Sequence, residues 1–351
     1  MDRLPPDFDE LDYIPSGYRY AERMAPGRWG EIPDVTKNSE HPPLVKLTYG
    51  LAVKAAGAPE PDWEQLDVGK PTPEAARPAF TAARWASAVP GIGQVAVAAA
   101  VHPLAGFLLA LDCYHAKYTA QAYLEGLPGL LFVLALLVFE RATREGGAAR
   151  RSDPDARLAL VAFALLGAAS AGKYPFGAVG VLALFPLALV AFPRRPLLWA
   201  GLGAVTLAAF VALDPYLWPD PAGRIWESAS YHFRYGESEH VKRAGLPWYQ
   251  QVVWLFEAAP TRWHAGVFPL GKLTVALLPL AVAGLPVALR RRPVWAIQAL
   301  VSFAFLLWWK TKWPQYLVLA LAPLAVCAAF APEALLALAR RVSSRGRPSV
   351  A

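Results

Sequence analysis

The sequence predicts an all-α polytopic membrane protein with about nine transmembrane helices and polar segments on the extracytoplasmic side. Three observations predict it. Of the 351 residues, 56% are hydrophobic and only 17% are charged, whereas a soluble chain of this length carries more charge. Long apolar runs fill most of the chain after Pro78. Arginines are concentrated in alternate loops between those runs, which is typical of membrane topology.

The first segment, residues 1–78, is called the head here. It is rich in proline and carries 14 acidic and 9 basic residues. We predict that it is an extracytoplasmic first loop with interfacial helices. The head precedes every apolar run and begins without a signal peptide. We therefore expect the reading frame to extend upstream into a first span of roughly 20 residues.

Nine apolar runs follow the head. They lie at about 80–100, 103–116, 122–139, 157–172, 175–192, 196–213, 269–289, 293–309 and 314–338. Most approach the roughly 20 residues that cross a bilayer core. The second run is short and ends in Asp112, Tyr114 and His115. The sequence thus predicts transmembrane helices over 79–213 and 269–351, the latter with a short basic tail, separated by an extracytoplasmic loop at 214–268.

The basic residues predict the orientation. One set of loops holds fourteen arginines, namely Arg141, Arg144, Arg150, Arg151, Arg157, Arg194, Arg195, Arg290, Arg291, Arg292, Arg340, Arg341, Arg345 and Arg347. The alternate short loops hold only Lys117, Lys173, Lys310 and Lys312. Short loops rich in basic residues stay in the cytoplasm, so the head and the 214–268 loop are predicted outside. This topology accounts for the net charge of +7 and leaves no reason to expect a nucleic-acid partner.

Residues that can carry chemistry gather on the predicted outer side. They are Asp9, Glu10, His41 and Lys46 in the head, Tyr118, Glu125, Lys173 and Tyr174 at span ends, Asp214 at the start of the large loop, and Lys310, Lys312 and Tyr316 in the last outer turn. Ionisable groups near membrane depth are costly unless they have partners or a function. Carboxylates can act as general bases, and lysines can bind a lipid phosphate as point charges.

Each of these residues also has a structural interpretation. An Asp–Glu pair is often solvated, and a carboxylate such as Glu125 is stabilised at a helix start. Lysines at span ends can extend to the interface, and the prolines after His41 can simply start a helix. Three histidines of the large loop, His232, His240 and His264, show no metal-ligand spacing, and we interpret them as surface or acceptor-groove residues.

The order of several short motifs resembles a known family. They are Asp9-Glu10, His41-Pro42-Pro43-Leu44, the run from Tyr118 to Glu125, Lys173-Tyr174, Asp-Pro-Tyr-Leu-Trp at 214–218 and Lys-Thr-Lys-Trp-Pro-Gln-Tyr at 310–316. In this order and spacing the chain resembles the GT-C membrane glycosyltransferases, in the branch of the protein O-mannosyltransferases and lipid A aminoarabinose transferases. The resemblance implies a GT-C-like helical bundle whose usual first span would precede residue 1.

The resemblance also implies roles for residues. Asp9 matches the family's catalytic base, and Glu10 beside it belongs to the mannosyltransferase-like version of the motif. Glu125 matches the family's second acidic position, and we expect both glutamates to position the acceptor or a cation. Lys173, Lys310, Lys312 and Lys46 are candidates to hold the donor phosphate, with His41, Tyr118, Tyr174 and Tyr316 in the same site. No cofactor is required, although a divalent cation is compatible.

The predicted protein is a hexosyl- or pentosyltransferase of the cell membrane. It would move a sugar from a polyprenyl-phosphate donor to a hydroxyl of a protein, lipid or glycan on the extracytoplasmic face. The alternatives are a transporter or flippase of a lipid-linked substrate, and an inactive membrane scaffold. Transporters often show internal repeats and broken helices, which the sequence does not clearly display. The catalytic hypothesis demands a pocket lined by Asp9, Glu125 and at least one of the candidate lysines.

Overall fold

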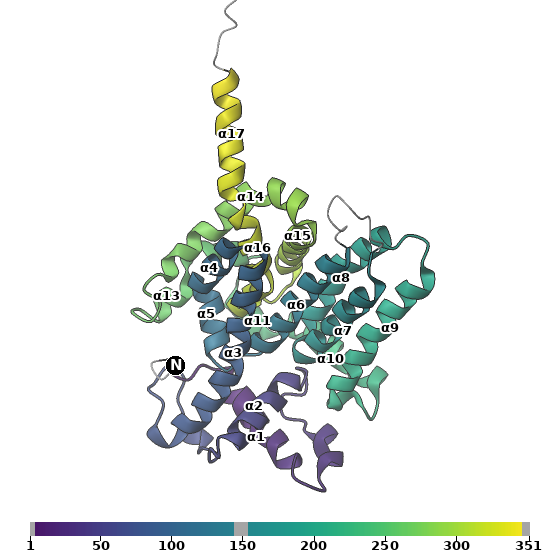
Figure 1. The fold of residues 1–351 in the computed structure, drawn as a ribbon. Coiled ribbons are helices and arrows are strands. Elements are labelled where there is room, and N and C mark those ends of the chain that lie inside the picture. The colour runs from purple at the N-terminus through teal and green to yellow at the C-terminus, as the bar shows by residue number, and fades with distance from the viewer. Residues whose placement is uncertain (1–3, 144–153, 346–351) are drawn as a thin grey trace, which may run out of the picture.

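A computed structural model describes residues 4–143 and 154–345, and within this part of the chain all regular structure is helical (Figure 1). Arg144, Arg150, Arg151 and Arg347 lie outside the described residues. The all-α architecture predicted from the sequence is confirmed. The elements of the head are α1 (Glu10–Arg23), η1 (Trp29–Asp34), α2 (Leu44–Ala55), η2 (Trp63–Gln65) and η3 (Glu74–Ala76).

The head is built on a tight pair of helices, α1 and α2. Gly17 and Gly50 face each other where the helices meet, and a side chain on Gly50 would run into the Gly17 carbonyl. The absence of a Cβ lets the two backbones approach closely. Tyr18 of α1 and Val45 of α2 belong to a cluster of buried side chains that also includes Phe80 of the bundle. Close packing therefore fixes the head against the bundle.

The bundle begins with a long helix that is followed by two short ones. The elements of this first half are α3 (Arg77–Val101), α4 (Pro103–Leu111), α5 (Cys113–Ala120), α6 (Gly126–Thr143), α7 (Ala156–Gly172), α8 (Tyr174–Ala191) and α9 (Pro196–Leu213). The short apolar run at 103–116 is divided at Asp112, whose side chain accepts a hydrogen bond from the backbone N–H of His115 and so caps α5. A side-chain cap of this kind starts a new helix.

Short helices occupy the 214–268 loop, and longer ones complete the bundle. The loop holds η4 (Pro215–Leu217), α10 (Pro221–Tyr235), α11 (Glu239–Ala244), α12 (Gln250–Glu257) and α13 (Ala259–Trp263). The remaining elements are η5 (Gly271–Ala276), α14 (Leu277–Arg291), α15 (Pro293–Trp308), η6 (Pro314–Leu317), α16 (Val318–Ala329) and α17 (Ala331–Arg345).

Several described helical segments are long and apolar enough to cross a membrane. There are five, at Gly126–Thr143, Tyr174–Ala191, Pro196–Leu213, Gly271–Arg291 and Pro314–Arg341. Two shorter apolar helices, Ala156–Gly172 and Pro293–Trp308, accompany them. The chain is therefore a multi-pass membrane protein. The number of nine spans stays a prediction.

Two apolar helices show how the bundle is arranged. Leu202 is the one buried residue of α9, so this helix presents its apolar surface to the surroundings, as a lipid-facing helix does. All twelve residues of α16 are buried, and this helix packs against α14, α15 and α4. The centre of the bundle is therefore formed near the end of the sequence.

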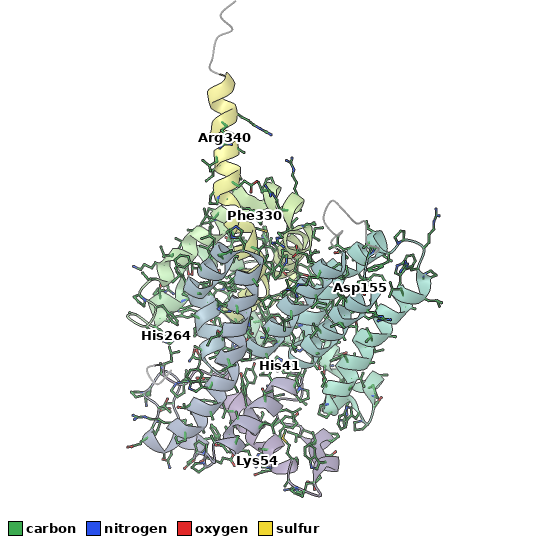
Figure 2. The ribbon with its side chains drawn as sticks, viewed as in Figure 1. His41, Lys54, Asp155, His264, Phe330 and Arg340 are labelled. Atoms are coloured by element: carbon green, nitrogen blue, oxygen red, sulfur yellow. The ribbon has the colours of Figure 1, made fainter. Side chains whose placement is uncertain are left out.

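The head and the arginine-bearing turns lie at opposite ends of the molecule. Figure 1 shows α1 and α2 at the bottom and α17 projecting from the top. Figure 2 labels Lys54 of the head at the bottom and Arg340 at the top, with Asp155, which precedes α7, at a level between them. The chain thus has a head end and an arginine end, as the charge asymmetry predicts.

Candidate active site

A cavity of about 700 Å³ lies between the head, the bundle and the 214–268 loop. This volume is within the range of about 300–1,000 Å³ that small-molecule sites occupy. Segments far apart in the sequence supply its wall: 5–13, 38–41, 68–69, 117–123, Lys173, 231–240, 263–264 and 313–316. Polar and aromatic side chains from the whole length of the chain therefore meet in one space.

Asp9 lies in the wall of this cavity at the start of α1. It occupies the N-cap position, but its carboxylate makes no capping hydrogen bond within the described helix. The Tyr13 hydroxyl and the Gln315 side-chain amide lie 3.4 and 3.3 Å from its Oδ2. Burial raises the pKa of Asp9 to about 7, with Lys173 opposing this shift and Glu125 adding to it. A carboxylate with such a pKa is suited to act as a base near neutral pH.

Glu10 points away from the cavity, towards α3. Its carboxylate is fully buried and forms a bidentate pair with Arg84, whose Nε and Nη2 donate over 2.8 and 2.7 Å. The backbone N–H groups of Ala122 and Asp7 also donate to it, over 2.8 and 3.0 Å. Such a carboxylate has its lone pairs satisfied. Glu10 therefore joins the head to the bundle and does not face a ligand in the cavity.

Lys173 brings a positive charge into the cavity wall next to Asp9. It lies between α7 and α8, is 5% exposed, and forms an ion pair with Glu125. Its Nζ also lies 4.8 Å from the centre of the Tyr316 ring. Among the residues that the structure describes, nothing hydrogen-bonds to Oε2 of Glu125. Glu125 is thus placed directly behind the lining residue Lys173.

His41 lines the cavity, whereas Lys46 does not. The His41 ring lies 5.4 Å from the ring of His232 and 5.9 Å from that of Tyr13. Burial, reinforced by the neighbouring His232 and Lys173, holds the pKa of His41 well below its usual range. The Nζ of Lys46 instead donates to the carbonyls of Asn38 and His41, over 2.5 and 2.8 Å. Lys46 therefore holds the 38–41 turn in place.

The remaining predicted residues are divided between the cavity and its surroundings. Tyr118 and Tyr316 line the cavity, and Tyr174 lines a small adjoining pocket together with His41 and Lys173. Lys310 is paired with Glu237 and lines a second pocket of about 90 Å³, which shares His232 with the cavity. Lys312 donates to the carbonyls of Leu306 and Leu307 over 2.7 and 2.9 Å, which satisfies the end of α15.

Sequence reasoning missed several residues of the cavity. Lys117 forms an ion pair of 2.8 Å with Asp7, and Gln315 reaches Asp9. The three loop histidines, His232, His240 and His264, are not among those missed: we interpret them from the sequence as surface or acceptor-groove residues, and all three line the cavity. Lys117 lies in a predicted outer loop and could have been selected with Lys173 on that ground. Asp7 gives no such signal, because its partner is distant in the sequence.

The charges in the cavity wall are mixed. Four acidic side chains, Asp7, Asp9, Asp12 and Glu40, share it with Lys117, Lys173 and four histidines. Within residues 4–143 and 154–345, no three His, Cys, Asp or Glu side chains gather as a group that could hold a metal ion. That no cofactor is required, with a divalent cation compatible, stays a prediction.

No family model matches the chain, and no curated protein matches it in sequence. Solved structures do match. The crystal structure of ArnT from Cupriavidus metallidurans bound to undecaprenyl phosphate is 18% identical, with a TM-score of 0.59 over 98% of this chain and 60% of that one. The apo structure of the same protein is 16% identical, with a TM-score of 0.53 over 97% and 59%. The chain thus spans about 60% of the length of the structures that it matches. At this identity the likeness concerns the fold alone, and it confirms the GT-C-like fold predicted from the sequence.

Proposed function

We propose that the chain is an integral-membrane glycosyltransferase that moves a sugar from a polyprenyl-phosphate donor to a hydroxyl acceptor on the extracytoplasmic face. One observation carries this proposal. Asp9, with a pKa raised to about 7, shares a cavity with Lys173 in a fold like that of ArnT, which binds undecaprenyl phosphate in one structure. A base and a candidate phosphate ligand thus occur together in one cavity.

The reaction is a direct displacement with Asp9 as the general base. A carboxylate oxygen of Asp9 takes the proton of the acceptor hydroxyl as the acceptor oxygen attacks the anomeric carbon. The bond between that carbon and the phosphate oxygen breaks, and its electron pair stays on the polyprenyl phosphate. Asp9 is left as the neutral acid and later returns its proton to water. This displacement inverts the anomeric centre and needs a base whose pKa is near the working pH.

Lys173 is the proposed ligand of the donor phosphate. A lysine ammonium has three N–H donors, so it can keep its ion pair with Glu125 while it donates to phosphate oxygens. Its positive charge stabilises the phosphate that leaves. Glu125 holds Lys173 in place, which makes it a positioning residue. Glu10 has the same kind of role through Arg84.

The small pockets beside the cavity offer a place for the start of the lipid chain. Phe233, Trp308 and Trp309 line a pocket of about 90 Å³ that shares His232 with the main cavity. Aromatic walls of this kind favour an isoprenoid over a polar group. We propose that the first isoprene units lie there, with the remaining chain in the bilayer.

The test is turnover of a polyprenyl-phosphate sugar by the purified full-length protein. Sugar transfer by the wild-type chain and its loss in Asp9→Asn, with donor binding retained, support the proposal. A transporter or a scaffold does not depend on a general base for sugar transfer, so its transport or assembly need not be lost in Asp9→Asn. Wild-type protein that binds undecaprenyl phosphate but transfers no sugar to proteins, lipids or glycans would overturn the enzymatic proposal.

The side of the membrane is tested separately by thiol labelling. Both native cysteines, Cys113 and Cys327, are buried, so the background labelling is low. Cysteines introduced at Lys310 and His240 should react with an impermeant reagent added outside intact cells. A cysteine at Arg340, at the arginine end, should react only after permeabilisation. The reverse pattern would place the cavity in the cytoplasm.

A further inference from the structure

One corner of the cavity takes no part in the proposed displacement. Lys117 of α5 lies there, 4% exposed, with its Nζ 2.8 Å from Asp7. The rings of Tyr118, Trp263 and Tyr123 surround this ammonium at 5.0, 5.3 and 6.0 Å. We call these five residues the Lys117 corner. All five line the cavity, so a ligand in the cavity can touch them.

The charge of the Lys117 corner is balanced. Burial raises the pKa of Asp7, but the adjacent Lys117 outweighs it, and the net shift is downward. Asp7 is therefore ionised and neutralises Lys117. Burial, with the positive charge of Lys117, lowers the pKa of the neighbouring His264, which keeps that ring uncharged. Three aromatic faces further stabilise the ammonium. The corner thus has no surplus positive charge with which to attract an anion.

The polar and apolar groups of the corner lie side by side. Trp263 is 43% exposed, and its ring makes an edge contact of 5.7 Å with that of Trp254, which supports the indole. Asp7 can accept and Lys117 can donate hydrogen bonds. A flat aromatic surface beside a donor and an acceptor fits a ligand with one apolar face and several hydroxyls.

The corner also lies close to the proposed base. Asp7 and Asp9 are on one short stretch of chain, and the negative charge of Asp7 contributes to the raised pKa of Asp9. The donor side of the cavity, at Lys173 and His41, is a different part of the wall. Figure 2 labels His41 and His264 well apart from each other, although both line the cavity.

We propose that the Lys117 corner is the acceptor subsite and that it binds a neutral sugar unit, so that the acceptor hydroxyl belongs to a saccharide. This inference rests on the proposed function, because only a transferase has an acceptor. The sugar ring stacks on Trp263, and its hydroxyls bond to Asp7 and Lys117. One hydroxyl is then presented to Asp9. A peptide hydroxyl is the competing class of acceptor.

The experiment measures sugar binding without turnover. The full-length protein in nanodiscs is probed by saturation-transfer NMR with methyl glycosides and neutral disaccharides, and in parallel with short Ser- and Thr-containing peptides. We expect a saccharide signal that falls roughly tenfold or more in Trp263→Ala and in Asp7→Asn, because stacking and a charged hydrogen bond are each lost. Trp248→Ala is the matched control, since Trp248 is 66% exposed in the same loop and lies outside the cavity lining.

The outcomes are distinct from those of the proposed function. Binding of undecaprenyl phosphate should stay within about twofold in both variants, which shows that they fold. If Trp263→Ala cannot be purified, Trp263→Leu replaces it, because it keeps bulk but removes the flat ring. Binding of peptides without saccharides, or a saccharide signal that Trp263→Ala leaves unchanged, overturns the inference. A failure of donor turnover with an intact saccharide signal overturns only the proposed function.

Discussion

Asp9 and Glu10 are neighbours in the sequence, yet their surroundings are opposite. The Asp9 carboxylate faces the cavity with two polar contacts of 3.3 and 3.4 Å. The Glu10 carboxylate faces the bundle, where Arg84 and two backbone N–H groups donate to it over 2.7 to 3.0 Å. A weakly solvated carboxylate with few hydrogen-bond partners is a candidate general base. A carboxylate whose hydrogen bonds are all made has a structural role.

The largest expected effect is on activity in Asp9→Asn. Loss of a general base typically reduces a rate by about 10²–10⁴-fold, and transfer should fall by this order. The fold should not suffer, because the raised pKa of Asp9 means that its ionised form is disfavoured in the folded protein. This penalty grows as pH rises from about 4 to about 7 and is constant above that range. The melting temperature of Asp9→Asn relative to wild type should therefore increase over the same interval.

Breaking the ion pair between Glu10 and Arg84 should have the reverse effect, because it lowers stability where Asp9→Asn lowers activity. Arg84→Met leaves Glu10 buried beside a methionine, and loss of one partner of a buried pair costs about 3–5 kcal/mol of stability. We expect a large drop in melting temperature in detergent. The double variant Arg84→Met/Glu10→Gln should recover part of it, because no uncompensated charge remains. Equal stability of Arg84→Met and wild type would contradict the structural role of this pair.

The dependence of kcat/KM on pH in a Lys173 variant tests the environment of Asp9 further. Since the base acts as its carboxylate, kcat/KM should rise with pH through about 7 and be lost below it, following the pKa of Asp9. Lys173 lowers that pKa, so Lys173→Gln should move the rising limb to higher pH. The same change should weaken donor binding about 10- to 100-fold, as for loss of a charged hydrogen bond. If kcat/KM rises over the same pH range in Lys173→Gln as in wild type, then Lys173 does not influence the pKa of Asp9.

The smallest effect is expected at Lys310. Its ion pair with Glu237 joins side chains that are 68% and 58% exposed, and exposed pairs contribute only about 0–1 kcal/mol. Lys310→Ala should change the melting temperature little and donor affinity less than about threefold. A large loss of donor affinity would instead make Lys310 a phosphate ligand equal to Lys173.

The sequence predicted helices better than it predicted contacts. The run at 157–172 became α7 (Ala156–Gly172), and 196–213 became α9 (Pro196–Leu213), because a bilayer core demands long apolar segments. The direction of a polar side chain has no such signature. Lys46 and Lys312 resemble Lys173 in the sequence, yet both donate to backbone carbonyls. These carbonyls need a side-chain donor only because the folded chain turns there. A shared side of the membrane thus predicts which residues lie near one another. It does not distinguish side chains that bind a ligand from those that stabilise the chain.

The burial of α16 has a consequence for how the protein is made. This helix fills the centre of the bundle and follows closely after Gln315 and Tyr316, which form the cavity wall beside Asp9. A ribosome delivers the head well before this segment. Until then α14, α15 and α4 surround an unfilled core, and the part of the cavity wall formed by 313–316 is missing. A chain stopped before Trp313 should accordingly be cut rapidly by protease, because the site is assembled only after α16 has been made.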